Sequence, residues 1–132
     1  MSATLHELKK ASDSLQIAQR LLRDANQNDP NNIDLHKALR DSCIQRFEFC
    51  VELSWKISIK LLGLDTKAPN PAIRDMAQNN LIDDPQIWFE FLLARNKTSH
   101  TYDEDVAKEV YREVERLIPE LEKLLEKLAQ LK

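Results

Sequence analysis

One long stretch of this sequence, residues 33–62, constrains the fold more than any other feature. Its C-terminal part, CIQRFEFCVELSWKISIKLL, places apolar side chains around most of a helical circumference. A helix that is apolar nearly all round must be covered by other elements on several sides. We therefore expect residues 33–62 to form the central helix, with these side chains buried: Ile44, Phe47, Val51, Leu53, Trp55, Ile57 and Leu61.

Helical periodicity also marks the segments on either side. Residues 5–25 repeat small and apolar side chains three and four positions apart, which predicts an amphipathic helix. Another helix is expected to begin at Pro85, after the potential N-cap Asp84, and to end near Asn96. A heptad pattern predicts a long last helix with a kink at Pro119. Its seam is Val110, Val114, Leu117, Leu121, Leu124, Leu128 and Leu131.

The segment between the second and third of these helices is a connection. Gly63 is a candidate C-cap, two prolines follow it, and AIRDMAQN is long enough for only two helical turns. No stretch alternates as a strand does. The sequence therefore predicts one all-α domain over residues 1–132, an up-and-down four-helix bundle with a short extra helix between the second and third long helices.

Composition and charge exclude several classes of protein. The net charge of -3 argues against a broad basic surface that coats nucleic acid. With no apolar run of membrane-spanning length and no secretory signal, the chain is expected to be cytoplasmic and to make no membrane contact. Cys43 and Cys50 would lie roughly 10 Å apart along a helix, too far for a disulfide, so both are expected to be reduced.

The stretch RNKTSHTYDED, residues 95–105, contains the strongest candidate for chemistry. On one continuous helix, Arg95 and His100 would point roughly 140° apart, so a shared site requires a helix break between them. Brought together by a turn, the guanidinium would neutralise charge on a phosphoryl group, and the imidazole would move a proton at neutral pH. Candidate N-caps for the next helix are Ser99, Thr101 and Asp103, and Thr101 with Glu104 has the spacing of a capping box.

Plainer interpretations of these residues remain open. An arginine and a histidine at a helix end are commonly solvent-facing or bonded to the last carbonyls. Tyr102 is as typical of a surface or packing residue as of a modification site. Arg46 is typical of a paired arginine beside an apolar face. Glu48 and Glu52 could chelate a cation, but they also fit an ordinary charged face. No ligand spacing or phosphate loop is present, so we expect no metal and no cofactor.

Three blocks of sequence carry a family resemblance. IQRFEFCVELSWKISIKLL is followed by LIDDPQIW and then by RNKTSHTYDED, which contains Arg95, His100 and Tyr102 in an Arg-x4-His-x-Tyr pattern. Together they resemble the HEPN superfamily and, within it, the nucleotidyltransferase substrate-binding protein family, over nearly the whole chain. The resemblance implies a four-helix bundle, usually a homodimer, that associates with a minimal nucleotidyltransferase.

The resemblance also implies roles for the motif. In HEPN ribonucleases the Arg-x4-His pairs of two protomers form a metal-independent site at the dimer interface. By position, Arg95 would stabilise the phosphate of an RNA substrate, His100 would handle the proton, and Asn96 would lie between them. In toxin–antitoxin modules of this type the nucleotidyltransferase can add AMP to the motif tyrosine, here Tyr102. The first hypothesis is therefore a ribonuclease toxin that is neutralised by its partner or by AMPylation.

The second hypothesis is a noncatalytic accessory subunit that holds a substrate for the nucleotidyltransferase. It requires a crevice between the central helix and the motif turn, in which a cation-bearing or nucleotide ligand would bind. The expected lining of that crevice is Arg46, Glu48, Glu52, Trp55 and Arg74.

Overall fold

The protein is a bundle of α-helices in which the longest helix lies in the middle. The structure is a computed structural model that describes residues 4–131, and no strand occurs among them. The all-helical fold with a short extra helix is therefore confirmed. In chain order the elements are α1 (Leu5–Asn28), α2 (Ile33–Leu62), α3 (Pro69–Gln78), α4 (Pro85–Arg95), the 3-10 turn η1 (Thr98–His100) and α5 (Glu104–Gln130).

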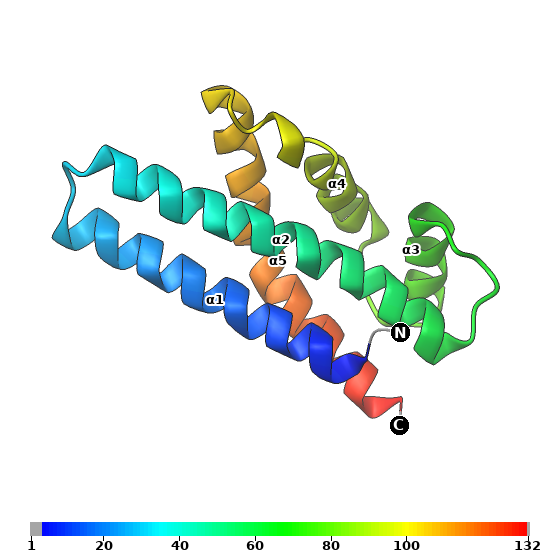
Figure 1. The fold of residues 1–132 in the computed structure, drawn as a ribbon. Coiled ribbons are helices and arrows are strands. Elements are labelled where there is room, and N and C mark those ends of the chain that lie inside the picture. The colour runs from blue at the N-terminus through cyan, green and yellow to red at the C-terminus, as the bar shows by residue number, and fades with distance from the viewer. Residues whose placement is uncertain (1–3, 132) are drawn as a thin grey trace.

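Helix α2 is the axis around which the other helices pack. Figure 1 shows α1 antiparallel beside it, α5 crossing behind it, and α3 and α4 along its C-terminal half. Within the expected core set, Leu53 and Leu61 are only half-buried, while the other five members are buried. The small residues Ser54 and Ser58 are buried too, because each hydroxyl donates to the carbonyl four residues earlier.

Local chemistry explains where the helices begin and end. The side chains of Asn32 and Asp84 accept hydrogen bonds from backbone N–H groups in the first turns of α2 and α4. Gly63 ends α2 with φ 67°, a left-handed conformation that glycine adopts without the steric cost of a Cβ. Pro119 lies inside α5, which continues as one helix past it to Gln130.

The core is apolar, and aromatic rings in it join α4 to α2. Trp88 packs edge-on against Phe91 with ring centroids 5.1 Å apart, and Phe91 packs edge-on against Phe47 on α2. Cys43 and Cys50 are buried free thiols, as expected, and burial raises their pKa to about 11 and about 12. Both therefore remain protonated packing residues at neutral pH.

The heptad seam of α5 faces the bundle over six of its seven members. All of them are fully buried except Leu131, which is 45% exposed at the end of the helix. Among the residues that the structure describes, no helix is long and apolar enough to cross a membrane.

A middle position and the last position of this seam should differ sharply in their effect on stability. We expect Leu121→Ala to lower the free energy of unfolding by about 2–5 kcal/mol, because it removes a fully buried side chain and leaves a cavity. Leu131→Ala makes the same chemical change at an exposed position and should cost well under about 1 kcal/mol. Urea denaturation of both variants measures the difference, and equal losses would contradict the burial pattern.

Candidate functional site

The candidate site is a corner of the bundle where α4 ends and α5 begins. Helix α4 stops at Arg95, the backbone turns through η1, and α5 starts after Asp103. Short-range bonds fix this turn, since the N–H of Lys97 donates to the carbonyl of Ala94 and the N–H of His100 donates to the carbonyl of Lys97. The expected helix break between Arg95 and His100 is therefore present.

Arg95 lies between α4 and α2 and is held there by a carboxylate. Its terminal nitrogen is 2.6 Å from an oxygen of Glu52, whose other oxygen is 3.4 Å from Lys56. The Nε of Arg95 is buried and has no hydrogen-bond partner within residues 4–131. The guanidinium is thus half-buried, with its charge offset by Glu52 and one nitrogen left without a partner.

Thr98 ties the turn to the central helix. Its hydroxyl lies 2.9 Å from a carboxylate oxygen of Glu48 and 2.8 Å from the carbonyl of Arg95, so it donates its single proton to one of these acceptors. Thr98 is a supporting residue of the corner that no sequence pattern had singled out. The available signal was its position three residues after the end of α4, where a hydroxyl readily bonds the last carbonyls of a helix.

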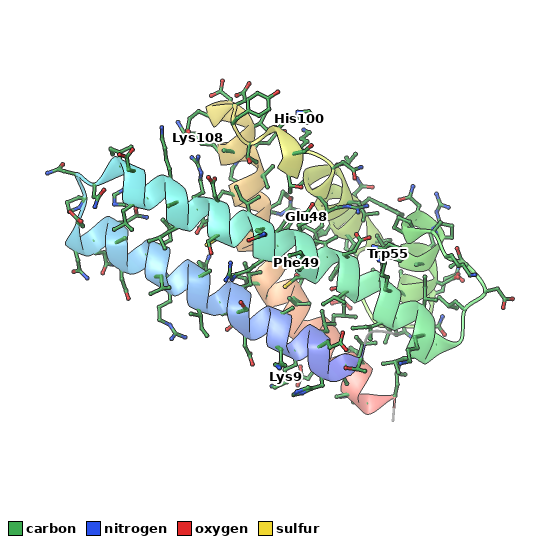
Figure 2. The ribbon with its side chains drawn as sticks, in the orientation of Figure 1. Lys9, Glu48, Phe49, Trp55, His100 and Lys108 are labelled. Atoms are coloured by element: carbon green, nitrogen blue, oxygen red, sulfur yellow. The ribbon has the colours of Figure 1, made fainter. Side chains whose placement is uncertain are left out.

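His100 and Tyr102 form the outer face of the corner. Figure 2 shows His100 at the outside of the turn, and Tyr102 is 86% exposed. The phenolic oxygen lies 3.5 Å from Nδ1 of His100, and the two rings meet edge to face with centroids 6.0 Å apart. Both side chains are therefore accessible to a macromolecule while their backbones are fixed.

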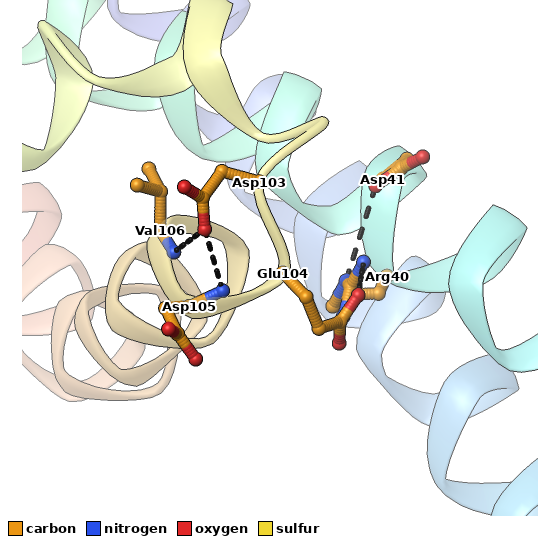
Figure 3. A network of polar contacts seen from close by, with 6 residues as sticks. All are labelled: Arg40, Asp41, Asp103, Glu104, Asp105 and Val106. Atoms are coloured by element: carbon orange, nitrogen blue, oxygen red, sulfur yellow. Dashed lines mark hydrogen bonds and ion pairs between the residues drawn. The ribbon is translucent and has the colours of Figure 1, made fainter.

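The start of α5 differs in detail from the expected capping box. Asp103, one of the three candidates, caps the helix by accepting from the N–H groups of Asp105 and Val106 (Figure 3). The pairing of Thr101 with Glu104 is wrong, because the Thr101 hydroxyl bonds the carbonyl of Thr98 within η1. Glu104 turns instead toward α2.

Glu104 joins the corner to α2 through Arg40. The two nitrogens of that guanidinium are 2.6 Å and 3.2 Å from the two carboxylate oxygens, a bidentate pair (Figure 3). The hydrogen bonds and positive charge of Arg40 hold the pKa of Glu104 below its ordinary value. No local pattern pointed to Arg40, because its partner is 64 residues away in the chain.

The expected crevice is divided into two shallow grooves. We call the first the α3–α4 groove; its volume is about 480 Å³ and it is lined by Pro69, Asn70, Arg74, Gln86, Phe89, Leu92, Leu93, Arg95 and Asn96. We call the second the α2 groove; its volume is about 490 Å³ and it is lined by Ala38, Asp41, Ser42, Ile44, Gln45, Glu48, Thr98 and Thr101.

Three residues expected in the crevice, Arg46, Glu52 and Trp55, line neither groove. Glu52 is instead paired with Arg95 and Lys56. Arg46 points to α1, where its Nε is 2.9 Å from the hydroxyl of Ser14, and it also bonds Ser42. Trp55 is 7% exposed, with Lys56 over its ring, so it belongs to the core. Arg46 and Trp55 stabilise helix packing, and the structure does not bring them together with Arg74 and Glu48.

The corner offers no ligand set for a metal ion. Among the described residues, no group of three or more histidine, cysteine, aspartate or glutamate side chains is close enough to hold one. Glu48 and Glu52 are engaged by Thr98 and by Arg95 with Lys56. The groups available for chemistry at the corner are therefore a guanidinium, an imidazole and a phenol.

The protein is thus an all-helical bundle with a polar corner at its last helix junction. Residues 3–130 match the family described as nucleotidyltransferase substrate binding protein like, and the chain belongs to that family.

Individual relatives agree with this assignment. The chain is 35% identical over 95 residues to a Haemophilus influenzae protein named probable ribonuclease HepT; the match covers 66% of this chain and 65% of the relative, just under two thirds of its length. A solved H. influenzae structure, described as revealing the fold of a substrate binding domain of a nucleotidyltransferase, superposes with a TM-score of 0.86 at 31% identity, over 96% of this chain and 100% of that one. A solved Thermus thermophilus structure gives 0.70 at 27% identity, over 89% and 98%.

The Arg40–Glu104 pair should make the stability of the corner depend on pH. Because the folded pKa of Glu104 lies below its ordinary value of 4.5, the pair stabilises the fold above that pH and loses its effect as the pH falls through the folded pKa. Glu104→Gln should therefore be less stable than the unsubstituted protein at pH 7, and the difference should shrink in acid.

Urea denaturation from neutral to acidic pH measures this difference. Glu122→Gln removes an exposed carboxylate elsewhere on α5 and serves as the matched control. If the free energy of unfolding of Glu104→Gln stays below that of the unsubstituted protein by a constant amount down to acidic pH, the role assigned to the pair is contradicted.

Proposed function

We propose that this chain is a metal-independent endoribonuclease of the HEPN type, the toxin component of a two-gene module with a minimal nucleotidyltransferase. The observation that supports the proposal is the corner itself, where α4 ends at Arg95 and the following turn carries His100 and Tyr102, with the imidazole and phenol open to solvent. The relative named probable ribonuclease HepT supports the same activity.

The chemistry uses the ribose 2′-hydroxyl as nucleophile. His100 removes the 2′ proton, the 2′ oxygen attacks the adjacent phosphorus, and the bond to the 5′ oxygen breaks, leaving a 2′,3′-cyclic phosphate and a 5′-hydroxyl after that oxygen takes up a proton. Arg95 stabilises the negative charge that develops on the phosphoryl oxygens. No metal is required, because both protons move through side chains.

A homodimer supplies what one chain lacks. The reaction needs a base for the 2′ oxygen and an acid for the 5′ oxygen, and the corner of one chain holds a single imidazole. In one chain Arg95 is also paired with Glu52, which offsets its charge. Two corners that face each other would provide two imidazoles and two guanidinium groups around one phosphate, and would concentrate positive charge on an otherwise acidic protein.

Tyr102 is the proposed control point. Its phenol is 86% exposed, so the active site of a nucleotidyltransferase can reach it. The phenolic oxygen would attack the α-phosphorus of ATP, and pyrophosphate would leave. The phenolic proton would pass to a base; the candidate is Nδ1 of His100, 3.5 Å from the phenolic oxygen. The attached AMP would add negative charge beside His100 and repel an RNA phosphate. Binding of the partner over the same corner would also block RNA.

A second candidate is a noncatalytic subunit that binds a substrate for the nucleotidyltransferase. The solved relative described as a substrate binding domain favours it, and the grooves beside the corner provide space for a small ligand. In that case the corner would bind and would not cleave.

Substitution of the motif should abolish cleavage. In the presence of EDTA, we expect His100→Ala and Arg95→Ala each to lower the rate of RNA cleavage by at least about 100-fold, because each removes a group that acts in the transition state. Lys108→Ala, an exposed residue on α5, is the control and should cleave normally. Unchanged cleavage by His100→Ala would refute the proposed mechanism, and no cleavage by any sample would favour the accessory subunit.

Tyr102→Phe should keep the RNA cleavage activity and lose its regulation by the partner. Incubated with the partner nucleotidyltransferase and ATP, the unsubstituted chain should gain the mass of one adenylyl group and lose RNA cleavage. Tyr102→Phe should gain no mass and keep its activity, because the phenylalanine ring lacks the nucleophilic oxygen. Intact-mass spectrometry with a parallel cleavage assay measures both, and adenylylation of Tyr102→Phe would place the modification on another residue.

A further inference from the structure

The α3–α4 groove has an unusual charge for this acidic protein. Its lining includes two cationic side chains, Arg74 and Arg95, and no carboxylate, although the chain has a net charge of -3. The α2 groove, by contrast, carries Asp41 and Glu48 and no cationic side chain. An anion approaching the corner is therefore attracted toward α3 and α4 and repelled from the α2 side.

The same groove contains an aromatic surface. Phe89 lies half-buried in its lining, and the guanidinium carbon of Arg74 is 5.8 Å from the ring centroid. Because the guanidinium of Arg74 lies over the Phe89 ring, the two form a layered surface on which a nucleobase can stack, since every base has a π-face and a guanidinium plane can also pack on it. Amide groups of Asn70 and Asn96 at the groove can donate and accept hydrogen bonds to a base edge.

Arg95 connects this groove to the cleavage corner. It lines the α3–α4 groove, pairs with Glu52 behind it, and begins the turn that leads to His100. Its buried Nε has no partner among the described residues. Arg95, Phe89 and Arg74 line the same groove, so a cleaved phosphate at Arg95 would have the adjoining nucleotide within reach of the other two residues.

We infer that the α3–α4 groove is a subsite for one nucleotide of single-stranded RNA beside the cleaved phosphate, with its base on Phe89 and its phosphate at Arg74. This inference rests on the proposed ribonuclease function and adds to it the residues that position the substrate. The groove volume of about 480 Å³ is within the range of roughly 300–1,000 Å³ common for ligand sites. Stacking tolerates any base, so the subsite gives affinity with little sequence preference.

Binding can be measured without cleavage by using a short 2′-O-methyl oligouridylate, which lacks the nucleophile. In fluorescence anisotropy with EDTA, Phe89→Leu should weaken binding of this probe about 5- to 150-fold and leave an abasic oligomer of equal charge unaffected. Arg74→Gln should weaken both probes and flatten the slope of log affinity against log salt by about 0.7–1. Arg20→Gln, an exposed charge on α1, is the matched control and should bind almost as the unsubstituted protein does.

The outcomes separate this inference from the ribonuclease proposal. Binding of both probes by Phe89→Leu and Arg74→Gln as tightly as by the unsubstituted protein, with melting temperatures unchanged, overturns the subsite even if RNA is cleaved. Selective loss of binding in these variants supports the subsite even if no sample cleaves RNA, in which case only the ribonuclease proposal fails. If Phe89→Leu weakens binding of ATP but not of the oligonucleotide, the groove serves a free nucleotide and the RNA subsite is refuted.

Discussion

The fold depends on the need to cover α2 on nearly every side. One neighbouring helix cannot cover all of its apolar side chains, so α1, α5 and the α3–α4 segment each pack against one part of its surface. Among its polar side chains, Glu48 and Glu52 face the junction of α4 and α5. The corner thus lies where the central helix offers charged partners: Glu52 pairs with Arg95 at the end of α4, and Glu48 contacts Thr98 in the turn that leads to His100.

The corner combines rigid support with accessible chemistry. Ion pairs from α2 hold its two ends, Glu52 with Arg95 at the end of α4 and Arg40 with Glu104 at the start of α5. Between these anchors, His100 and Tyr102 remain exposed. This arrangement suits a site that meets a large partner, because the supporting residues are fixed from behind and the reactive groups need no opening of the bundle.

An acidic chain needs local positive charge to act on RNA as proposed. Glu52 lowers the net charge of the corner in one chain, so a phosphate must compete with it for Arg95. The α3–α4 groove shifts that balance toward anion binding, because Arg74 adds a cationic side chain and the groove lining includes no carboxylate. A second copy of the corner would add a second imidazole and a second guanidinium, the latter paired with its own Glu52. Affinity for RNA in this account is local and depends on assembly.

Periodicity was enough to predict the helices, because buried side chains at helical spacing leave a strong pattern; the bounds of α2, residues 33–62, agree with the structure. Turn chemistry was predicted less well. Asp103 and Thr101 are both good caps, and only the three-dimensional turn decides between them. The motif pointed to Arg95 and His100, but the residues that fix the turn around them, Arg40 through Glu104 and Thr98 through Glu48, have partners far away in the sequence. Arg46 and Trp55 were assigned to a crevice because a helix wheel shows the face of a side chain and not what covers it.

The most direct test of the central claim is the chemistry of the cleaved bond. An RNA with a single preferred cleavage position would be incubated in EDTA with the protein, beside the same RNA carrying one 2′-deoxyribose at that position, and the product ends would be identified by mass spectrometry. We expect 2′,3′-cyclic phosphate and 5′-hydroxyl ends from the first RNA and no cleavage at the substituted position. Cleavage next to the deoxyribose, or products that end in a 5′-phosphate, would contradict it.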